Sequence, residues 1–165
     1  MSQQAFAAAL RRIMQQQLST GRSLLALAEL SEKAIIEGDT RQLEALVPQQ
    51  RILIEQQLAQ ENARQQATAE LSAKLGLNQA PTLTTLLPEL SPGEAIALAS
   101  LRTQILATQR RMESQNHCNA QLLENALGFV KFNLEALTSA ALRPARYGVN
   151  MAQLEAPSFY IDSRV

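Results

Sequence analysis

The fold is decided by the stretch from Ser91 to Leu142, which reads SPGEAIALASLRTQILATQRRMESQNHCNAQLLENALGFVKFNLEALTSAAL. Ser91 is a good N-cap, Pro92 suits the first helical position, and Glu94 completes a capping box. No proline follows within this stretch. The pattern therefore predicts one helix of about fifty residues, which would be roughly 75 Å long at 1.5 Å per residue.

Apolar and small side chains recur along this stretch at alternating steps of three and four residues, as in a heptad seam. The seam comprises Leu98, Leu101, Ile105, Thr108, Met112, Leu122, Ala126 and Phe129. An amide layer at Gln115 and Asn119 interrupts it. We favour a register-setting role for this layer, because buried polar residues at such seams commonly fix register. The alternative is a patch of amides that binds a partner's backbone.

Two earlier stretches have the same helical periodicity. The first runs from about Gln3 to Glu37, and Gly38 is expected to end it, with Asp39 as the N-cap of the next helix. That second helix meets Pro48, which predicts a kink or a short break because proline lacks the backbone donor. It then continues to Gly76, an expected left-handed cap.

A linker of residues 77–90 separates the second stretch from the long helix. Within it, residues 82–87 are predicted to form a short helix that turns Leu83, Leu86 and Leu87 inward. The whole chain is rich in leucine, alanine and glutamine and has only 4% aromatic residues, which favours long helices packed side by side. The sequence thus predicts an all-α fold, an elongated antiparallel bundle of two or three long helices plus short linker helices, over residues 1–142. A flexible C-terminal tail is expected over residues 143–165.

The charge and cysteine content narrow the classes of function. Fifteen basic residues balance fifteen acidic ones, so charge offers no reason to expect a nucleic acid partner. The apolar runs are shorter than the ~20 residues that membrane insertion requires. The single cysteine excludes an internal disulfide, and the N-terminus lacks the features of a signal peptide. We therefore expect a cytoplasmic protein.

Candidates for catalysis or metal binding are weak. His117 and Cys118 are adjacent, so on a helix they point about 100° apart and do not face each other. No second histidine or cysteine is available for a zinc site, and no glycine-rich phosphate loop is present. The carboxylates Glu29 and Glu32, and likewise Glu61 and Glu70, look like parts of solvated helix faces. We expect no enzyme activity, no metal and no cofactor.

The end of the long helix is apolar on more than one face, unlike a helix that hides one stripe against its own domain. One row comprises Leu123, Leu127, Val130, Leu134, Leu137 and Ala141, and another comprises Leu122, Ala126, Phe129 and Asn133. Phe132 lies off both rows, beside Gly128. Burial by the first helix is one explanation. We favour a surface for a partner helix, because the tail adds the aromatic residues Tyr147, Phe159 and Tyr160.

Two segments resemble the FlgN-type flagellar export chaperones. Residues 25–46 (LALAELSEKAIIEGDTRQLEAL) are similar to the family's helix, glycine–aspartate break and Leu-x-x-Leu. The segment from Asn119 to Leu137, followed by Tyr147-Gly148 and a terminal Asp162-Ser163-Arg164-Val165, is similar to its C-terminal region.

The resemblance implies a cytoplasmic chaperone that holds hook-associated proteins, those of the hook–filament junction, before export. We call such a cargo protein the client. The export apparatus would be a second partner. In the family the C-terminal region binds the client, which by resemblance assigns this role to Phe129, Val130, Phe132, Leu134 and Leu137 with Tyr147, Phe159 and Tyr160. Leu123 and Leu127, from the apolar row, complete the predicted site.

Two other classes of function fit the same helices. The chain could be a structural coiled-coil protein that forms a homo-oligomer through its C-terminal apolar surface, or an adaptor for a folded signalling partner. A tail with tyrosine and phenylalanine favours the chaperone, because such a tail could cover the apolar surface until a client displaces it.

Overall fold

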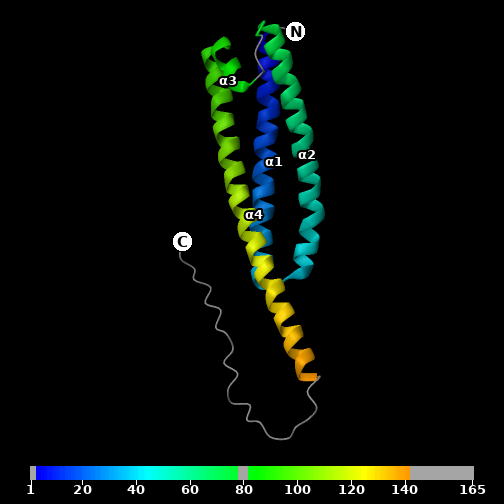
Figure 1. The fold of residues 1–165 in the computed structure, drawn as a ribbon. Helices are drawn as coiled ribbons and strands as arrows, with labels where there is room; N and C mark the ends of the chain where they lie inside the picture. The colour runs from blue at the N-terminus through cyan, green and yellow to red at the C-terminus, as the bar shows by residue number, and fades with distance from the viewer. Residues whose placement is uncertain (1–2, 78–81, 142–165) are drawn as a thin grey trace. The chain divides into compact units, whose positions relative to one another are not determined.

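A computed structural model describes residues 3–77 and 82–141 of the chain. The elements are α1 (Gln3–Glu37), α2 (Thr40–Lys74), α3 (Leu83–Leu86), the 3-10 helix η1 (Leu87–Glu89) and α4 (Pro92–Ala141). These residues contain no strand. The predicted all-α fold, with three long helices and short linker helices, is confirmed (Figure 1).

The turn between α1 and α2 follows from two residues. Gly38 has a φ of 68°, in the left-handed region where glycine has no side-chain clash. Asp39 then caps α2, because its Oδ1 accepts a hydrogen bond from the backbone N–H of Gln42 at 2.9 Å. Both roles were predicted from the sequence. The turn is short, so α1 and α2 are antiparallel neighbours.

The short break predicted at Pro48 is wrong. α2 runs without interruption from Thr40 to Lys74 with Pro48 inside it. Pro48 is exposed, so its ring meets water and not a packed neighbour. Beside it, the Gln49 side chain donates a hydrogen bond to the carbonyl of Ala45 at 3.0 Å. Pro48 leaves the carbonyl of Glu44 without its helical donor, and the packing of the rest of α2 on α1 keeps the helix continuous despite this loss.

The linker also follows the sequence closely. Gly76 ends α2 with a φ of 67°. Thr82 caps α3 in a reciprocal capping box with Thr85, and Leu83 and Leu86 turn inward as predicted. At the start of α4 the hydroxyl of Ser91 donates to a carboxylate oxygen of Glu94 at 3.0 Å. The predicted pair is therefore in contact at the helix start.

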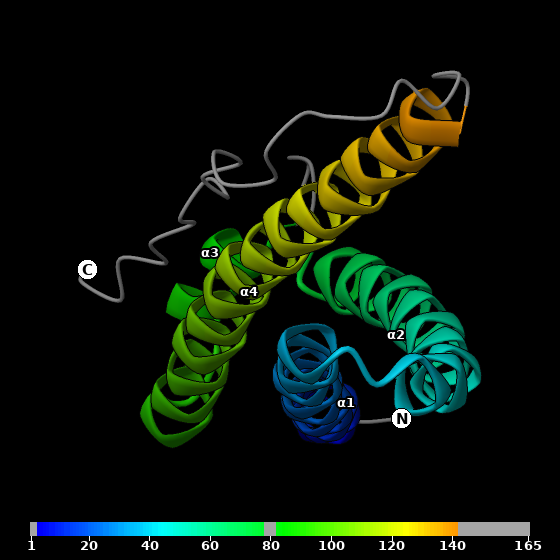
Figure 2. The ribbon, with the colours of Figure 1, turned by 90° about the horizontal axis from the view of Figure 1, so that it is seen from below.

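The chain divides into two compact units, residues 1–126 and residues 127–165, which we describe separately. In the first unit α1 contacts both other long helices (Figures 1 and 2). The backbones of α1 and α2 approach each other closely, whereas α4 meets α1 through its side chains. Figure 2 shows α2 and α4 on different sides of α1.

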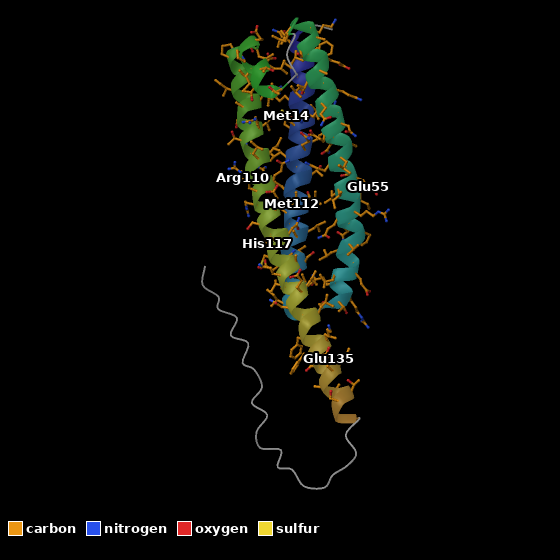
Figure 3. All side chains as sticks on the ribbon, viewed as in Figure 1. Met14, Glu55, Arg110, Met112, His117 and Glu135 are labelled. Atoms are coloured by element: carbon orange, nitrogen blue, oxygen red, sulfur yellow. The ribbon has the colours of Figure 1, made fainter. Side chains whose placement is uncertain are left out.

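The apolar core of the first unit lies at the end that holds α3. Leu10, Leu71, Leu86 and Leu98, one from each of α1, α2, α3 and α4, are at most 1% exposed. Leu83 and Leu90 belong to the same cluster, so α3 and the residues that flank it cover the apolar core at this end of the first unit. Met14 of α1 is also buried there (Figure 3). Burial of each large aliphatic side chain contributes about 1.5–3 kcal/mol.

The other half of the α1–α4 interface is polar. Asn119 donates to the backbone carbonyl of Ala28 at 2.9 Å, and Gln115 donates to Glu32 at 2.7 Å. Gln115 also donates to the side-chain oxygen of Asn119 at 3.2 Å. The predicted amide layer therefore lies between two helices and bonds to specific partners, which is the arrangement expected of a register-setting layer.

Residues 127–141 of α4 are the described part of the second unit. The predicted boundary between a bundle ending at residue 142 and a tail over 143–165 lies outside the described residues, and it stays a prediction. No described helix combines the length and the apolar character that crossing a membrane would require.

Candidate functional site

The last turns of α4 present large apolar side chains to solvent. The segment is helical because leucine, alanine, glutamate and lysine favour helix, and Thr138 bonds back to the carbonyl of Leu134 at 2.9 Å. Leu127 is 68% exposed and Phe132 is 58% exposed. The other exposed members are Phe129, Val130, Leu134 and Leu137. We call these six residues the apolar helix end.

The spacing within the apolar helix end creates two surfaces. Leu127, Val130, Leu134 and Leu137 follow one another at steps of three and four residues, so they form one stripe along the helix. Phe129 and Phe132, three residues apart, form a second surface. Apolar side chains that cover this much of a helix circumference are typical of a surface that another chain covers.

The remaining predicted site residues lie elsewhere. Leu123 belongs to the first unit and is exposed, four residues before Leu127. Tyr147, Phe159 and Tyr160 lie outside the described residues. The structure thus gives exposed side chains for the seven predicted residues on α4, and the role of all ten in binding stays a prediction.

Gly128 interrupts the apolar helix end without serving as a packing contact. Apart from its chain neighbours and the nearby backbone of its own helix, no described atom lies within 4 Å of the position that a Cβ would take there. Its effect is instead on the helix itself, since glycine is about 1 kcal/mol less favourable than alanine in a helix interior.

His117 and Cys118 point to different partners. The Nε2 atom of His117 lies 3.1 Å from the amide nitrogen of Gln121, whereas the Cys118 thiol donates to Glu32 at 3.5 Å. Partial burial and the neighbouring carboxylate of Glu32 raise the pKa of Cys118, so its thiol stays protonated near neutral pH. Among the described residues no group of three or more potential ligands is arranged to hold a metal ion.

A polar network in the first unit was missed by the sequence analysis. Glu61 of α2 accepts hydrogen bonds from Arg64 at 2.6 and 2.8 Å and from Gln17 of α1 at 2.9 Å. The hydrogen bonds from Arg64 hold the pKa of Glu61 at about 2, against an ordinary value of 4.5. The Glu61 side chain is 38% exposed, so it lies at the edge of a solvated helix face, but it also bonds to α1, which was not predicted. Its spacing of three residues from Arg64 was the available signal.

This network borders a pocket of about 500 Å³ in the first unit. Residues from α1, α2, the start of α3 and α4 line the pocket. Arg64 and Arg102 contribute two guanidinium groups, and Leu83, Ile105 and Leu106 contribute apolar surface. The pocket is open to solvent, so a group from outside can enter it.

Comparison with known proteins agrees with the geometry. The family model described as FlgN protein matches residues 1–154, which is nearly the whole chain. The comparison with curated proteins and the comparison with solved structures found no match. The matched range includes the turn at Gly38, the amide layer and the apolar helix end. The chain belongs to the FlgN family of flagellar export chaperones.

Proposed function

We propose that this protein binds the helical terminal region of a hook-associated protein in the cytoplasm and keeps it from assembling before export. The apolar helix end, together with Leu123 and the aromatic residues Tyr147, Phe159 and Tyr160, forms the binding site. The observation that carries the proposal is the exposure of Leu127, Phe129, Val130, Phe132, Leu134 and Leu137 on consecutive turns of one helix.

The chemistry of this surface suits a helical client. An amphipathic helix binds an apolar surface through side chains at positions i, i+3, i+4 and i+7, which matches the stripe from Leu127 to Leu137. Between Leu127 and Leu137 the charged residues are Lys131 and Glu135. Contact is thus mainly hydrophobic. A client segment that folds on binding loses conformational entropy, so its affinity is moderate and its release needs no chemical step.

Phe132 provides the clearest test. Its side chain is 58% exposed, so replacing it with alanine removes little buried surface from the free protein. Loss of an aromatic anchor from an interface typically costs about 2 kcal/mol or more, which corresponds to roughly a thirty-fold weaker affinity. Ile36→Ala is the matched control, because Ile36 is exposed to a similar degree on α1.

The experiment is calorimetric titration of purified hook-associated proteins from the same organism into the wild type, Phe132→Ala, Ile36→Ala and a chain ending at residue 142. We expect the wild type and Ile36→Ala to bind with the same affinity, and the other two to bind more weakly. Equal binding by all four would exclude this site. Failure of the wild type to bind any hook-associated protein would exclude the chaperone function proposed here.

The competing function is that of a structural coiled-coil protein that forms a homo-oligomer. The spacing of the apolar stripe on α4 favours it. Leu127, Val130, Leu134 and Leu137 have the three- and four-residue spacing of a coiled-coil seam, which could pair with the same stripe of a second copy. Sedimentation equilibrium without client distinguishes the two. A stable oligomer that Leu127→Glu and Leu134→Glu convert to a monomer, without any effect on client binding, would favour the structural role.

A further inference from the structure

The pocket of about 500 Å³ in the first unit borders the apolar core. Met14 of α1 and Leu83 of α3 line the pocket, and both belong to the cluster of buried residues at this end of the unit. Ile105 of α4 also lines the pocket and packs against the same cluster. Protein pockets of about 300–1,000 Å³ commonly bind a ligand. An aliphatic side chain that entered this pocket would leave water and contact core residues.

The α4 wall of the pocket is apolar in its middle and polar at both ends. Arg102 and Gln109 are seven residues apart, so they lie on the same side of the helix. Ile105 and Leu106 lie between them at steps of three and four residues, and all four side chains line the pocket. Leu106 is 37% exposed. A group bound in the pocket can thus contact aliphatic surface and polar donors on one helix.

Arg102 gives the pocket a positive charge that the described residues do not neutralise. The other charged residues of the lining, Glu61 and Arg64, bond to each other at 2.6 and 2.8 Å, so their charges cancel. Arg102 is exposed and forms no ion pair within the described part of the chain. The pocket therefore favours an occupant that carries one negative charge.

Two more side chains of the lining have donors to offer. Thr84 of α3 and Gln109 of α4 are exposed, and neither side chain has a hydrogen-bond partner in residues 3–77 and 82–141. The hydroxyls of Thr82 and Thr85, in contrast, are engaged in the capping box of α3. A carboxylate only accepts hydrogen bonds, so it matches a site that offers a guanidinium, a hydroxyl and an amide N–H.

We propose that this pocket binds the client at a second point, by receiving one of its aliphatic side chains together with a neighbouring aspartate or glutamate. The proposal rests on the chaperone function proposed above. The aliphatic side chain packs against Leu83, Ile105 and Leu106, and the carboxylate pairs with Arg102. A small molecule is the poorer occupant, because pockets that bind one usually bury roughly 70–90% of its surface and this pocket is open to solvent.

Two arginines on α4 provide a matched test. Arg102 lines the pocket, whereas Arg110 (Figure 3) lies outside its lining and is likewise exposed without an ion pair to any described residue. Arg102→Glu and Arg110→Glu make the same change of charge on the same helix, and glutamate preserves helix propensity. Arg102→Lys retains the positive charge. Circular dichroism and thermal melts establish that all three variants stay folded.

The assay is calorimetric titration of the purified hook-associated protein that the wild type binds, with Phe132→Ala measured alongside. We expect Arg102→Glu to weaken binding about ten-fold, and Arg102→Lys and Arg110→Glu to change it less than about two-fold. The loss in Arg102→Glu should shrink at high salt, because salt screens exposed charges.

Two results would overturn the proposal while the proposed function stands. In the first, Phe132→Ala weakens binding but Arg102→Glu does not. In the second, Arg102→Glu and Arg110→Glu weaken binding equally, which would show a general effect of charge and no role for the pocket. If the wild type binds no hook-associated protein, both proposals fail.

Cross-linking identifies the occupant. A photoreactive amino acid in place of Thr84, which is exposed and lines the pocket, should form an adduct with the client, and the same group at position 110 should form little. The cross-linked client peptide should contain an aspartate or glutamate near an aliphatic residue. A peptide without an acidic residue would overturn the proposal. An adduct with the mass of two copies of this chain, formed equally with and without client, would also overturn it.

Discussion

Replacing leucine by alanine should have opposite consequences at two places in this fold. Leu86 of α3 is 0% exposed and packs in the core of the first unit, whereas Leu127 is 68% exposed. Removing a fully buried leucine side chain costs about 2.7–5 kcal/mol, because apolar burial is lost and a cavity remains. At the exposed position little burial is lost, so Leu127→Ala should change the unfolding free energy by no more than about 0.5 kcal/mol.

Urea denaturation followed by circular dichroism measures both effects. For a protein of this size 1 kcal/mol corresponds to about 2–4 °C, so a loss of about 3 kcal/mol in Leu86→Ala also lowers Tm by roughly 10 °C. The melts should be repeated over a hundred-fold range of protein concentration. A loss in Leu127→Ala as large as that in Leu86→Ala would refute the reasoning, because Leu127 would then be buried in solution. If the stability loss in Leu127→Ala depended on protein concentration, Leu127 would be buried against a second copy of the chain.

Three further predictions concern local features. Gly128→Ala should stabilise the end of α4 by about 1 kcal/mol, seen as up to about five-fold slower amide exchange over residues 127–137, because nothing in the described chain crowds the added Cβ. Asp39→Ala should lower the unfolding free energy by about 1 kcal/mol in urea, whereas Asp39→Asn, which retains a capping acceptor, should not. The lowered pKa of Glu61 adds stability that is present above pH 4.5 and is lost as the pH falls toward 2, so Glu61→Gln should flatten the pH dependence of stability in that window.

The helices could be predicted from the sequence because their ends depend on local chemistry. Gly38, Asp39 and Gly76 act through backbone conformation and capping, which depend on the residue itself and its nearest neighbours. Pro48 shows the limit of such reasoning. An isolated helix would be expected to break at Pro48. In this fold α2 stays continuous, because it packs against α1 along its length.

The candidate site divides in the same way. Exposure of the apolar helix end could be predicted, since too many faces of that segment are apolar for one neighbouring helix to cover. The pocket could not be predicted, because Gln17 and Glu61 are 44 positions apart and meet only through the register of α1 against α2.

The central claim is that the apolar helix end binds the client, and amide hydrogen exchange with and without client tests it most directly. Exchange is compared by mass spectrometry for the free wild type and for its complex with a purified hook-associated protein. The account predicts that peptides covering residues 127–137 exchange more slowly in the complex, because bound client restricts opening of this exposed helix. A complex in which the exchange of residues 127–137 is unchanged would contradict the claim.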